Sequence, residues 1–249
     1  MYTGGWPELY AREGKNIKKY LDDYINSYIE KDIVLTSGIQ KQFEFLKFVK
    51  LLAGRVGQVL EYSGFANELG VDAKTIKEWT SLLERMRVIF LVKPFSGNLT
   101  SRLIKSPKIF FIDTGLACRL QGWSSAEPIL TSPQQSFLFE NLVFSEIYKL
   151  TNNFQLDWEI FHWRTKDQEE IDFLIQKGSN EFLFVESKIS YQNPIELKNF
   201  PAVRKCFKNK EIPVLHCIME GDHILNRNVP IALLSELLLS QSGLKRKKN

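Results

Sequence analysis

The sequence predicts a mixed α/β (α+β) protein, in which a helical N-terminal segment and a winged helix precede a domain of helices packed on a mixed sheet. Three observations lead to this prediction. Apolar residues recur at helical spacing through the first 53 residues. Two short helical stretches and two strand-like runs follow up to residue 112. Beyond residue 124, a long helical stretch precedes three strand-like runs, a helix and a further strand-like run, an order typical of layered α/β domains. We therefore expect three parts, at residues 1–53, 54–123 and 124–249.

Length and composition are those of a globular protein with a mild positive charge. The chain has 249 residues, of which 44% are hydrophobic and 25% charged, and a formal net charge of +4. This charge permits an anionic partner without requiring one. Cys118, Cys206 and Cys217 lie far apart, so neither a structural zinc site nor a disulfide framework is expected. No stretch has the character of a signal peptide or a membrane helix, and we expect a cytoplasmic protein without a membrane partner.

The first 53 residues are expected to form helices. Apolar side chains follow helical spacing around residues 17–29 and again in residues 40–52. We expect this segment to pack on the part that follows.

Residues 54–112 have the order of a winged helix. Residues 64–69 predict a short helix, Gly70-Val71 a turn, and Asp72 an N-cap for a second helix over residues 73–87. Strands are expected at 88–92 and 109–112, with the turn residues 94–98 at the tip of the wing. The second helix could enter a DNA major groove with Lys74, Thr75 and Lys77 facing outward. Alternatively, the winged helix could be a protein-interaction module, since acidic residues share that helix.

A helix that begins after Ser132-Pro133 opens the third part. Serine is a good N-cap and proline is favoured in the first turn. Glu140, in SFLFENLVFSEIYKL, falls near the edge of the apolar stripe of this helix. It could therefore sit over the end of a sheet, or it could be an ordinary exposed glutamate.

The stretch WRTKDQEEIDFLIQKGSNEFLFVESKIS is the centre of the predicted sheet. Strands at 171–175 and 182–185 flank a turn, and further strands are expected at 158–163 and 213–219, with helices at 195–207 and 230–239. Because side chains alternate along a strand, Glu186 and Lys188 share one face, roughly 6–7 Å apart. Asp172 joins them if the hairpin pairs in register. Two carboxylates in apolar strands are costly to bury, so a metal ion or a charge network is expected there.

An aspartate in one strand followed by Glu-x-Lys in the next resembles the PD-(D/E)XK nuclease-like fold. The resemblance implies that Asp172 and Glu186 hold a divalent metal, Mg²⁺ or Mn²⁺, and that Lys188 assists the attacking water. It also implies that Glu140, on the preceding helix, completes the metal site. Glu170, two residues before Asp172, could be a further ligand or a strand-end residue in water. Arg164 could hold a phosphate, pair with Glu170, or lie free on the surface.

The longer pattern is similar to the C-terminal region of a family of prokaryotic AAA+ ATPases of uncertain role. GGWPELY, YIEKDI, the winged-helix-like middle, FHWRTKDQEEIDFLI and VESKIS occur in that order. The sequence contains no G-x-x-x-x-G-K-[ST] stretch, so no ATP site is expected in this chain. An ATPase is instead a candidate partner.

Two classes of function follow from the sequence. The first is a metal-dependent nuclease, or a nuclease-like protein that binds nucleic acid. The second is a non-catalytic module that docks DNA or protein for an ATPase. The basic C-terminal residues Lys245, Arg246, Lys247 and Lys248 could contact nucleic acid or simply be a solubilising end.

Overall fold

The computed structural model describes residues 1–11, 16–95, 106–164, 169–193, 207 and 212–241, and it has the mixed α/β class that the sequence predicts. Contacts divide the chain into two compact units. Unit 1 comprises Met1–Leu91 and Ser106–Leu142, and unit 2 comprises Val92–Lys105 and Val143–Asn249. The chain therefore passes between the units three times.

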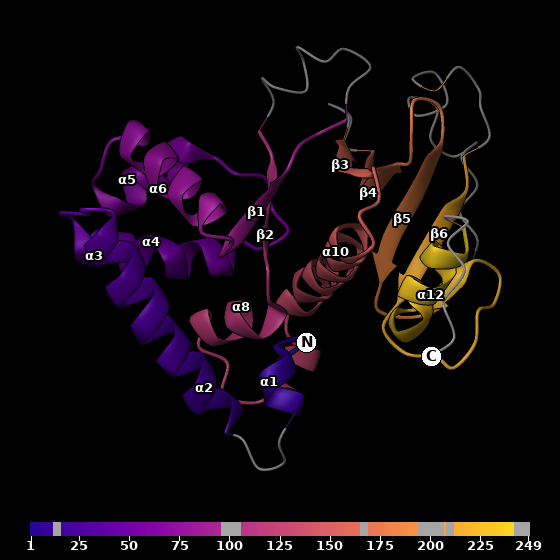
Figure 1. The fold of residues 1–249 in the computed structure, drawn as a ribbon, viewed down its shortest axis with the longest axis horizontal. Helices are drawn as coiled ribbons and strands as arrows, with labels where there is room; N and C mark the ends of the chain where they lie inside the picture. Colours follow the sequence, from indigo (N-terminus) through magenta and orange to yellow (C-terminus); the bar gives the residue numbers. More distant parts are fainter. Residues whose placement is uncertain (12–15, 96–105, 165–168, 194–206, 208–211, 242–249) are drawn as a thin grey trace. The chain divides into compact units, whose positions relative to one another are not determined.

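Unit 1 is mainly helical and contains one two-stranded sheet (Figure 1). Its elements are α1 (Pro7–Tyr10), α2 (Ile17–Tyr24), the π-helix η1 (Ile25–Ile33), α3 (Val34–Thr36), α4 (Gln42–Gly54), α5 (Tyr62–Leu69), α6 (Ala73–Arg85), β1 (Ile89–Val92), β2 (Lys108–Phe111), α8 (Thr114–Leu120), α9 (Glu127–Leu130) and the first turns of α10 (Gln134–Asn153).

The order α5, α6, β1, β2 is that of the predicted winged helix. Gly70 ends α5 in the left-handed conformation, with a φ of 64°, which glycine adopts without strain. Asp72 then caps α6, because its carboxylate accepts a hydrogen bond from the Thr75 N–H at 2.8 Å. The local signals in the sequence therefore place these helices to within two residues.

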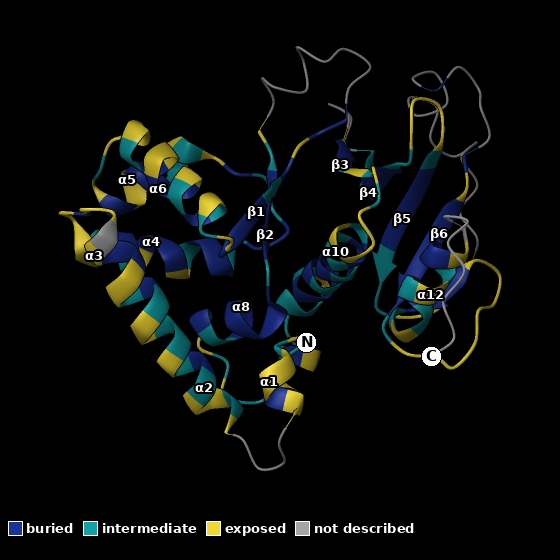
Figure 2. Cartoon of the chain, viewed as in Figure 1, coloured by how far each residue is buried: buried dark blue, intermediate teal, exposed yellow. Residues whose placement is uncertain are grey.

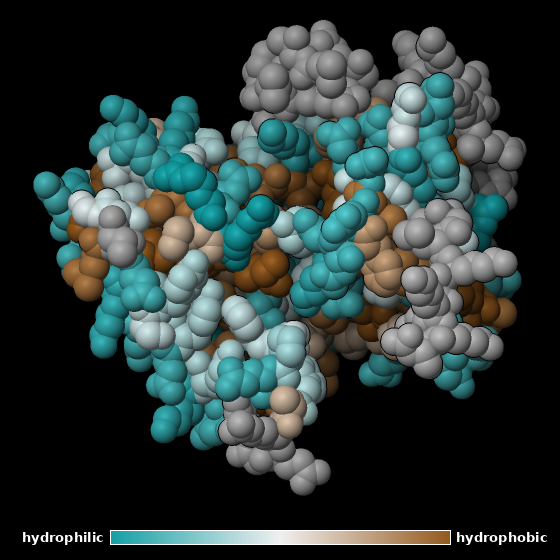
Figure 3. Space-filling view, viewed as in Figure 1, coloured by the Kyte–Doolittle hydropathy of each residue, from teal (hydrophilic) through white to brown (hydrophobic). Residues whose placement is uncertain are grey.

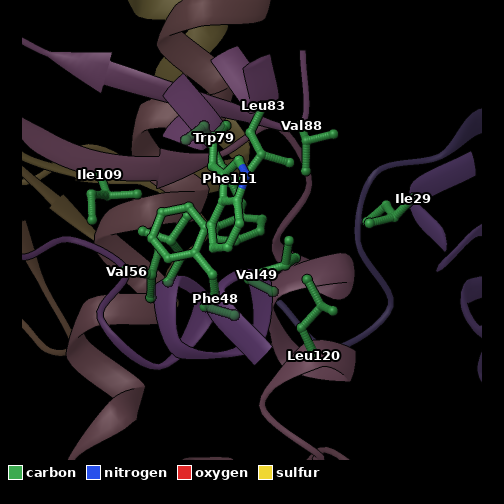
Figure 4. Packing of buried hydrophobic residues seen from close by; sticks show 14 of the residues in the cluster. Ile29, Phe48, Val49, Val56, Trp79, Leu83, Val88, Ile109, Phe111 and Leu120 are labelled. Carbon is green, nitrogen blue, oxygen red and sulfur yellow. The ribbon is translucent and has the colours of Figure 1, made fainter. Parts of the chain in front are cut away.

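One hydrophobic core runs through the whole of unit 1. It joins Ile29 of η1, Phe48 of α4, Trp79 of α6, Phe111 of β2 and Leu120 of α8 (Figure 4). The parts predicted at residues 1–53 and 54–123 thus share a single core and form one unit. Hydrophilic side chains cover most of the helices in the space-filling view, with an apolar area near α3 (Figure 3).

The division between the units falls inside α10, whereas the sequence places a boundary at residue 124. The first half of α10 packs on unit 1, where Leu138 is fully buried in its core. The buried Asn141 side chain also accepts a hydrogen bond from the Phe111 N–H at 2.6 Å and donates to the Phe111 carbonyl at 3.1 Å. These contacts hold the start of the helix against β2.

Unit 2 is built on a five-stranded mixed sheet in the order β3-β4-β5-β6-β7. β3 pairs with β4 and β4 with β5 in antiparallel fashion, whereas β5 pairs with β6 and β6 with β7 in parallel. The predicted helix at 195–207 lies outside the described residues, apart from Phe207. The elements are β3 (Glu159–Arg164), β4 (Glu170–Gln176), β5 (Phe182–Lys188), β6 (Val214–Ile218), β7 (Asn228–Pro230) and α12 (Ile231–Gln241).

Residues 93–95 extend this sheet beyond β3. The Phe95 N–H donates to the His162 carbonyl at 2.7 Å, and the His162 N–H donates to the Lys93 carbonyl at 3.1 Å. The Phe95 ring stacks on Phe207, with 5.2 Å between centroids. The sequence places residues 94–98 at the tip of the wing. Instead, Phe95 belongs to the core of unit 2, Pro94 forms a parallel bridge with His162, and residues 96–98 lie outside the described part of the chain.

The two faces of the sheet have different coverings, and its central strands are largely buried (Figure 2). On one face, Phe144 of α10 packs against Phe173 of β4, with centroids 6.2 Å apart. On the other face, Phe184 of β5 contacts Phe207 at 5.6 Å. Strand alternation puts Glu186 and Lys188 on the same face as Phe184. The candidate site is therefore the polar end of a sheet face that is apolar at Phe184.

Candidate functional site

The candidate site lies where β4 and β5 stop pairing as strands. Their backbone register runs from Gln176↔Phe182 to Phe173↔Val185. Beyond this point carboxylates accept the hydrogen bonds. The Ser187 N–H donates to Asp172 Oδ2 at 2.8 Å, and the Asp172 N–H donates to Glu186 Oε1 at 3.2 Å. Each acid is thus fixed by a backbone N–H of the other strand.

Lys188 completes the group that the structure brings together. Its Nζ donates to Glu186 Oε2 at 2.8 Å, and the Ser187 hydroxyl donates to Asp172 Oδ2 at 2.7 Å. The Glu186 side chain is only 7% exposed, whereas that of Lys188 is 33% exposed. The site is therefore a buried carboxylate with a lysine that reaches solvent.

Burial and charge both act on Glu186. Desolvation, followed by the charge of Asp172, raises the pKa of the Glu186 carboxyl from 4.5 to about 7, although Lys188 opposes the shift. Two carboxylates in this position repel each other, and a further cation beside them would relieve that repulsion.

His216 is a member of the site that sequence reasoning missed. It lies directly opposite Glu186 in the parallel register of β5 and β6, so their side chains share a face. Its side chain is buried, and neither ring nitrogen has a hydrogen-bond partner among the described residues. Burial and the charge of Lys188 lower the pKa of His216, so the imidazole is neutral. In the sequence, the only signal is one histidine inside an apolar run, which we would interpret as structural.

Asn228, on β7, is the neighbour of His216 in the sheet and forms hydrogen bonds with the loop that follows β5. It is fully buried and pairs in register with His216. Its Oδ1 accepts from the Gln192 N–H at 3.0 Å, and its Nδ2 donates to the Gln192 carbonyl at 2.8 Å. The segment that follows β5 is thereby fastened to β7. The three-residue strand β7 is too short for a periodic signal in the sequence.

Glu140 has a partner within unit 1, and its expected role in completing a metal site stays a prediction. It belongs to unit 1, where its carboxylate forms a buried ion pair with Lys108 at 2.8 Å. Among the residues that the structure describes, no three Asp, Glu, His or Cys side chains gather closely enough to hold a metal ion. The helical spacing of apolar residues in α10 places Glu140 on a buried face of the helix. That spacing cannot show which residue lies opposite Glu140.

The predicted accessory residues pair with each other. Arg164 and Glu170 lie opposite one another in the register of β3 and β4. The Arg164 Nε and Glu170 Oε2 atoms are 3.8 Å apart, and both side chains are partly exposed. Of the three alternatives for Arg164, the structure has the pair with Glu170.

The predicted nucleic-acid residues of α6 lie at its start. Lys74 is exposed and lies 3.8 Å from Glu78. The Thr75 hydroxyl donates to Asp72 at 2.7 Å as part of the helix cap. The Lys77 ammonium lies 5.4 Å from the centre of the Tyr62 ring. Residues 245–248 lie outside the described part of the chain.

Comparison with known families covers most of the chain. The chain belongs to the family described as domain of unknown function DUF8612, whose model matches residues 1–127. Residues 135–234 match a second model, domain of unknown function DUF4143. The two matches meet near the predicted boundary at residue 124, whereas contacts place the division within α10.

Curated relatives are longer than this chain. An uncharacterized protein of Mycobacterium tuberculosis is 25% identical over 182 residues, which are 73% of this chain and 40% of that protein. An uncharacterized protein of Haemophilus influenzae is 24% identical over 211 residues, 82% of this chain and 49% of its own length. The chain thus spans less than half of these relatives. No solved structure matches the chain. In the described residues, no helix combines the length and apolarity needed to cross a membrane.

Proposed function

We propose that unit 2 is a PD-(D/E)XK nuclease-like domain that hydrolyses phosphodiester bonds in nucleic acid with the help of Mg²⁺ or Mn²⁺. The observation that carries this proposal is the convergence of Asp172, Glu186 and Lys188 where β4 and β5 separate. The sheet supports it, because the acids lie on adjacent antiparallel strands and Glu186 and Lys188 share a face.

The two carboxylates suit a magnesium ion. Mg²⁺ is usually held by one or two carboxylates and keeps several waters, so Asp172 and Glu186 are sufficient ligands without Glu140. Burial and then the charge of Asp172 raise the pKa of Glu186, and a bound cation would offset both effects. When bound, the ion would supply a more acidic water and charge neutralisation at phosphorus.

The protein's own groups would act on this site in two ways. The backbone N–H groups of Ser187 and Asp172 hold the two carboxylates in place, so little reorganisation is needed. Lys188 reaches solvent, and its ammonium can orient the attacking water or stabilise negative charge on the phosphate.

The second candidate is a non-catalytic docking module, which one observation favours. Lys188 already neutralises Glu186 through a 2.8 Å ion pair, so the network is closed without a metal. In this hypothesis the winged helix, through Lys74, Thr75 and Lys77, and unit 2 dock nucleic acid or an AAA+ ATPase.

The proposed setting for either function is the reducing cytoplasm. Cys118 and Cys217 are buried, free thiols, which supports this placement.

Metal titration separates the two candidates. The melting temperature and the cleavage of single- and double-stranded DNA and RNA would be followed as Mg²⁺ or Mn²⁺ is added. The nuclease predicts metal-dependent stabilisation and cleavage, both lost in Asp172→Asn and Glu186→Gln. Glu159→Gln, an exposed acid at the start of β3, is the matched control and should behave as the parent. A parent protein that neither cleaves nor gains stability with either ion would end the nuclease proposal.

A further inference from the structure

Three large apolar side chains are exposed in the loops that follow β5 and β6. Tyr191 is 44% exposed, Ile224 45% and Leu225 47%. Because β5 and β6 are parallel, both loops leave the sheet at the same edge. Lys188 is the last residue of β5, so the candidate site opens at this edge too. The carboxyl ends of parallel strands are the usual ligand-binding edge of an α/β sheet.

Hydrogen bonds hold the two loops together. The Asn226 side chain donates to the Tyr191 hydroxyl at 2.7 Å. Leu225 and Asn228 exchange backbone hydrogen bonds of 3.1 and 2.8 Å, and the Asn228 side chain binds both backbone groups of Gln192. The Tyr191 ring is therefore oriented before any ligand arrives, which lowers the entropy cost of binding.

We propose that the Tyr191 ring stacks on a base of a single-stranded nucleic acid, that Ile224 and Leu225 pack against the neighbouring bases, and that the nucleic-acid backbone passes Lys188. This inference rests on the proposed function and names its substrate class. Aromatic side chains stack on bases of any sequence, provided that the bases are not already paired within a duplex. In a double helix the base faces are stacked on one another, so such a surface would meet only phosphates, sugars and base edges.

The charges beside the loops fit a backbone that passes on one side. Lys188 and the exposed Arg227 supply cations, and Arg227 directly follows Asn226, which holds Tyr191. Glu220 and Asp222 begin the same loop and would repel phosphates, although Asp222 pairs with His223. We therefore expect the nucleic-acid backbone to run along Leu225–Arg227 rather than along the start of the loop.

The test is binding of fluorescently labelled strands without cleavage. Anisotropy would be measured in EDTA with oligothymidylate, oligouridylate and a duplex, each about 20 nucleotides long, which exceeds the site size of one binding fold. The parent should bind a single strand more tightly than the duplex, and the two single strands show whether DNA or RNA is preferred. Tyr191→Ala should weaken single-strand binding about tenfold. Tyr191→Phe should weaken binding by less, about two- to threefold, because the ring remains although its hydrogen bond to Asn226 is lost.

Phe154→Ala is the matched control, since Phe154 is an exposed aromatic residue after α10, at 46% exposure. It should bind as the parent does. Single-strand binding that is unchanged in Tyr191→Ala, or duplex binding as tight as single-strand binding, would overturn the inference. So would a parent that binds no strand, which would favour a protein partner at this edge.

The failure of this inference is distinguishable from failure of the proposed function. Mg²⁺-dependent cleavage by a parent whose binding ignores Tyr191 would refute the stacking role alone. Tyr191-dependent binding by a parent that never cleaves would support the stacking role and refute the phosphodiesterase.

Discussion

Glu186→Gln should stabilise the metal-free protein at alkaline pH, because the wild-type carboxylate is buried beside Asp172. The pKa of Glu186 rises from 4.5 to about 7. A rise of one in the pKa corresponds to about 1.4 kcal/mol. When Glu186 is ionised in the folded protein, it therefore lowers the free energy of unfolding by about 3 kcal/mol. Glutamine keeps nearly the same shape without the charge.

The sign of the effect sets its pH window. Between pH 4.5 and about 7, the folded protein holds a proton on Glu186 that the unfolded chain has released. The stability contributed by this residue therefore falls as the pH rises through that window. The advantage of Glu186→Gln should grow from about 1 kcal/mol near pH 5 to about 3 kcal/mol near pH 8.5.

Urea unfolding in EDTA at the two pH values, followed by circular dichroism, measures this difference. Glu159→Gln is the control and should change stability by less than about 0.5 kcal/mol at either pH. Added Mg²⁺ should narrow the gap by stabilising the wild type. If Glu186→Gln is equally destabilising at both pH values, the ionised carboxylate is a net stabilising partner of Lys188. Repulsion between Asp172 and Glu186 would then not destabilise the folded protein.

Three further changes test other parts of the structure. Lys108→Ala should cost about 3–5 kcal/mol in urea unfolding by removing the cation that pairs with the buried Glu140 carboxylate, whereas Lys108→Met with Glu140→Leu should be close to neutral. An equal loss in both variants would mean that packing, not charge, determines the stability of this pair. Phe95→Ala should cost about 3–5 kcal/mol through the cavity left in unit 2, and a loss below 1 kcal/mol would place the ring outside the core. If the winged helix contacts phosphates, the double variant Lys74→Ala with Lys77→Ala should reduce the slope of log affinity against log salt concentration for DNA by up to about two. An unchanged slope would exclude α6 from the interface.

Local signals were sufficient to predict most of the described elements and the core of the candidate site. Strand alternation alone puts Glu186 and Lys188 on one face, and the turn at Gly178 places Asp172 on the neighbouring strand. The cap at Asp72 likewise needs only residues within one helical turn. Each of these features is set within about 20 residues of sequence.

Features that depend on distant pairing could not be predicted. Glu140 forms its buried ion pair with Lys108, which lies 32 positions earlier at the start of β2. His216 faces Glu186 because of a parallel register, which no local pattern encodes. Residues 93–95 join β3 through long-range hydrogen bonds, although the sequence places residues 94–98 at the tip of the wing.

The most direct test of the proposed phosphodiesterase is its single-turnover cleavage rate in Mg²⁺, compared among the wild type, Asp172→Asn and Lys188→Ala. The wild type should cleave, and Asp172→Asn should abolish cleavage together with Mg²⁺ binding measured by calorimetry. Lys188→Ala should retain Mg²⁺ binding but slow cleavage by about 10²–10⁴-fold, since its role lies at the water and the phosphate. Cleavage that persists at the wild-type rate in Asp172→Asn, or that is absent from the wild type in both Mg²⁺ and Mn²⁺, would contradict the assignment of this site.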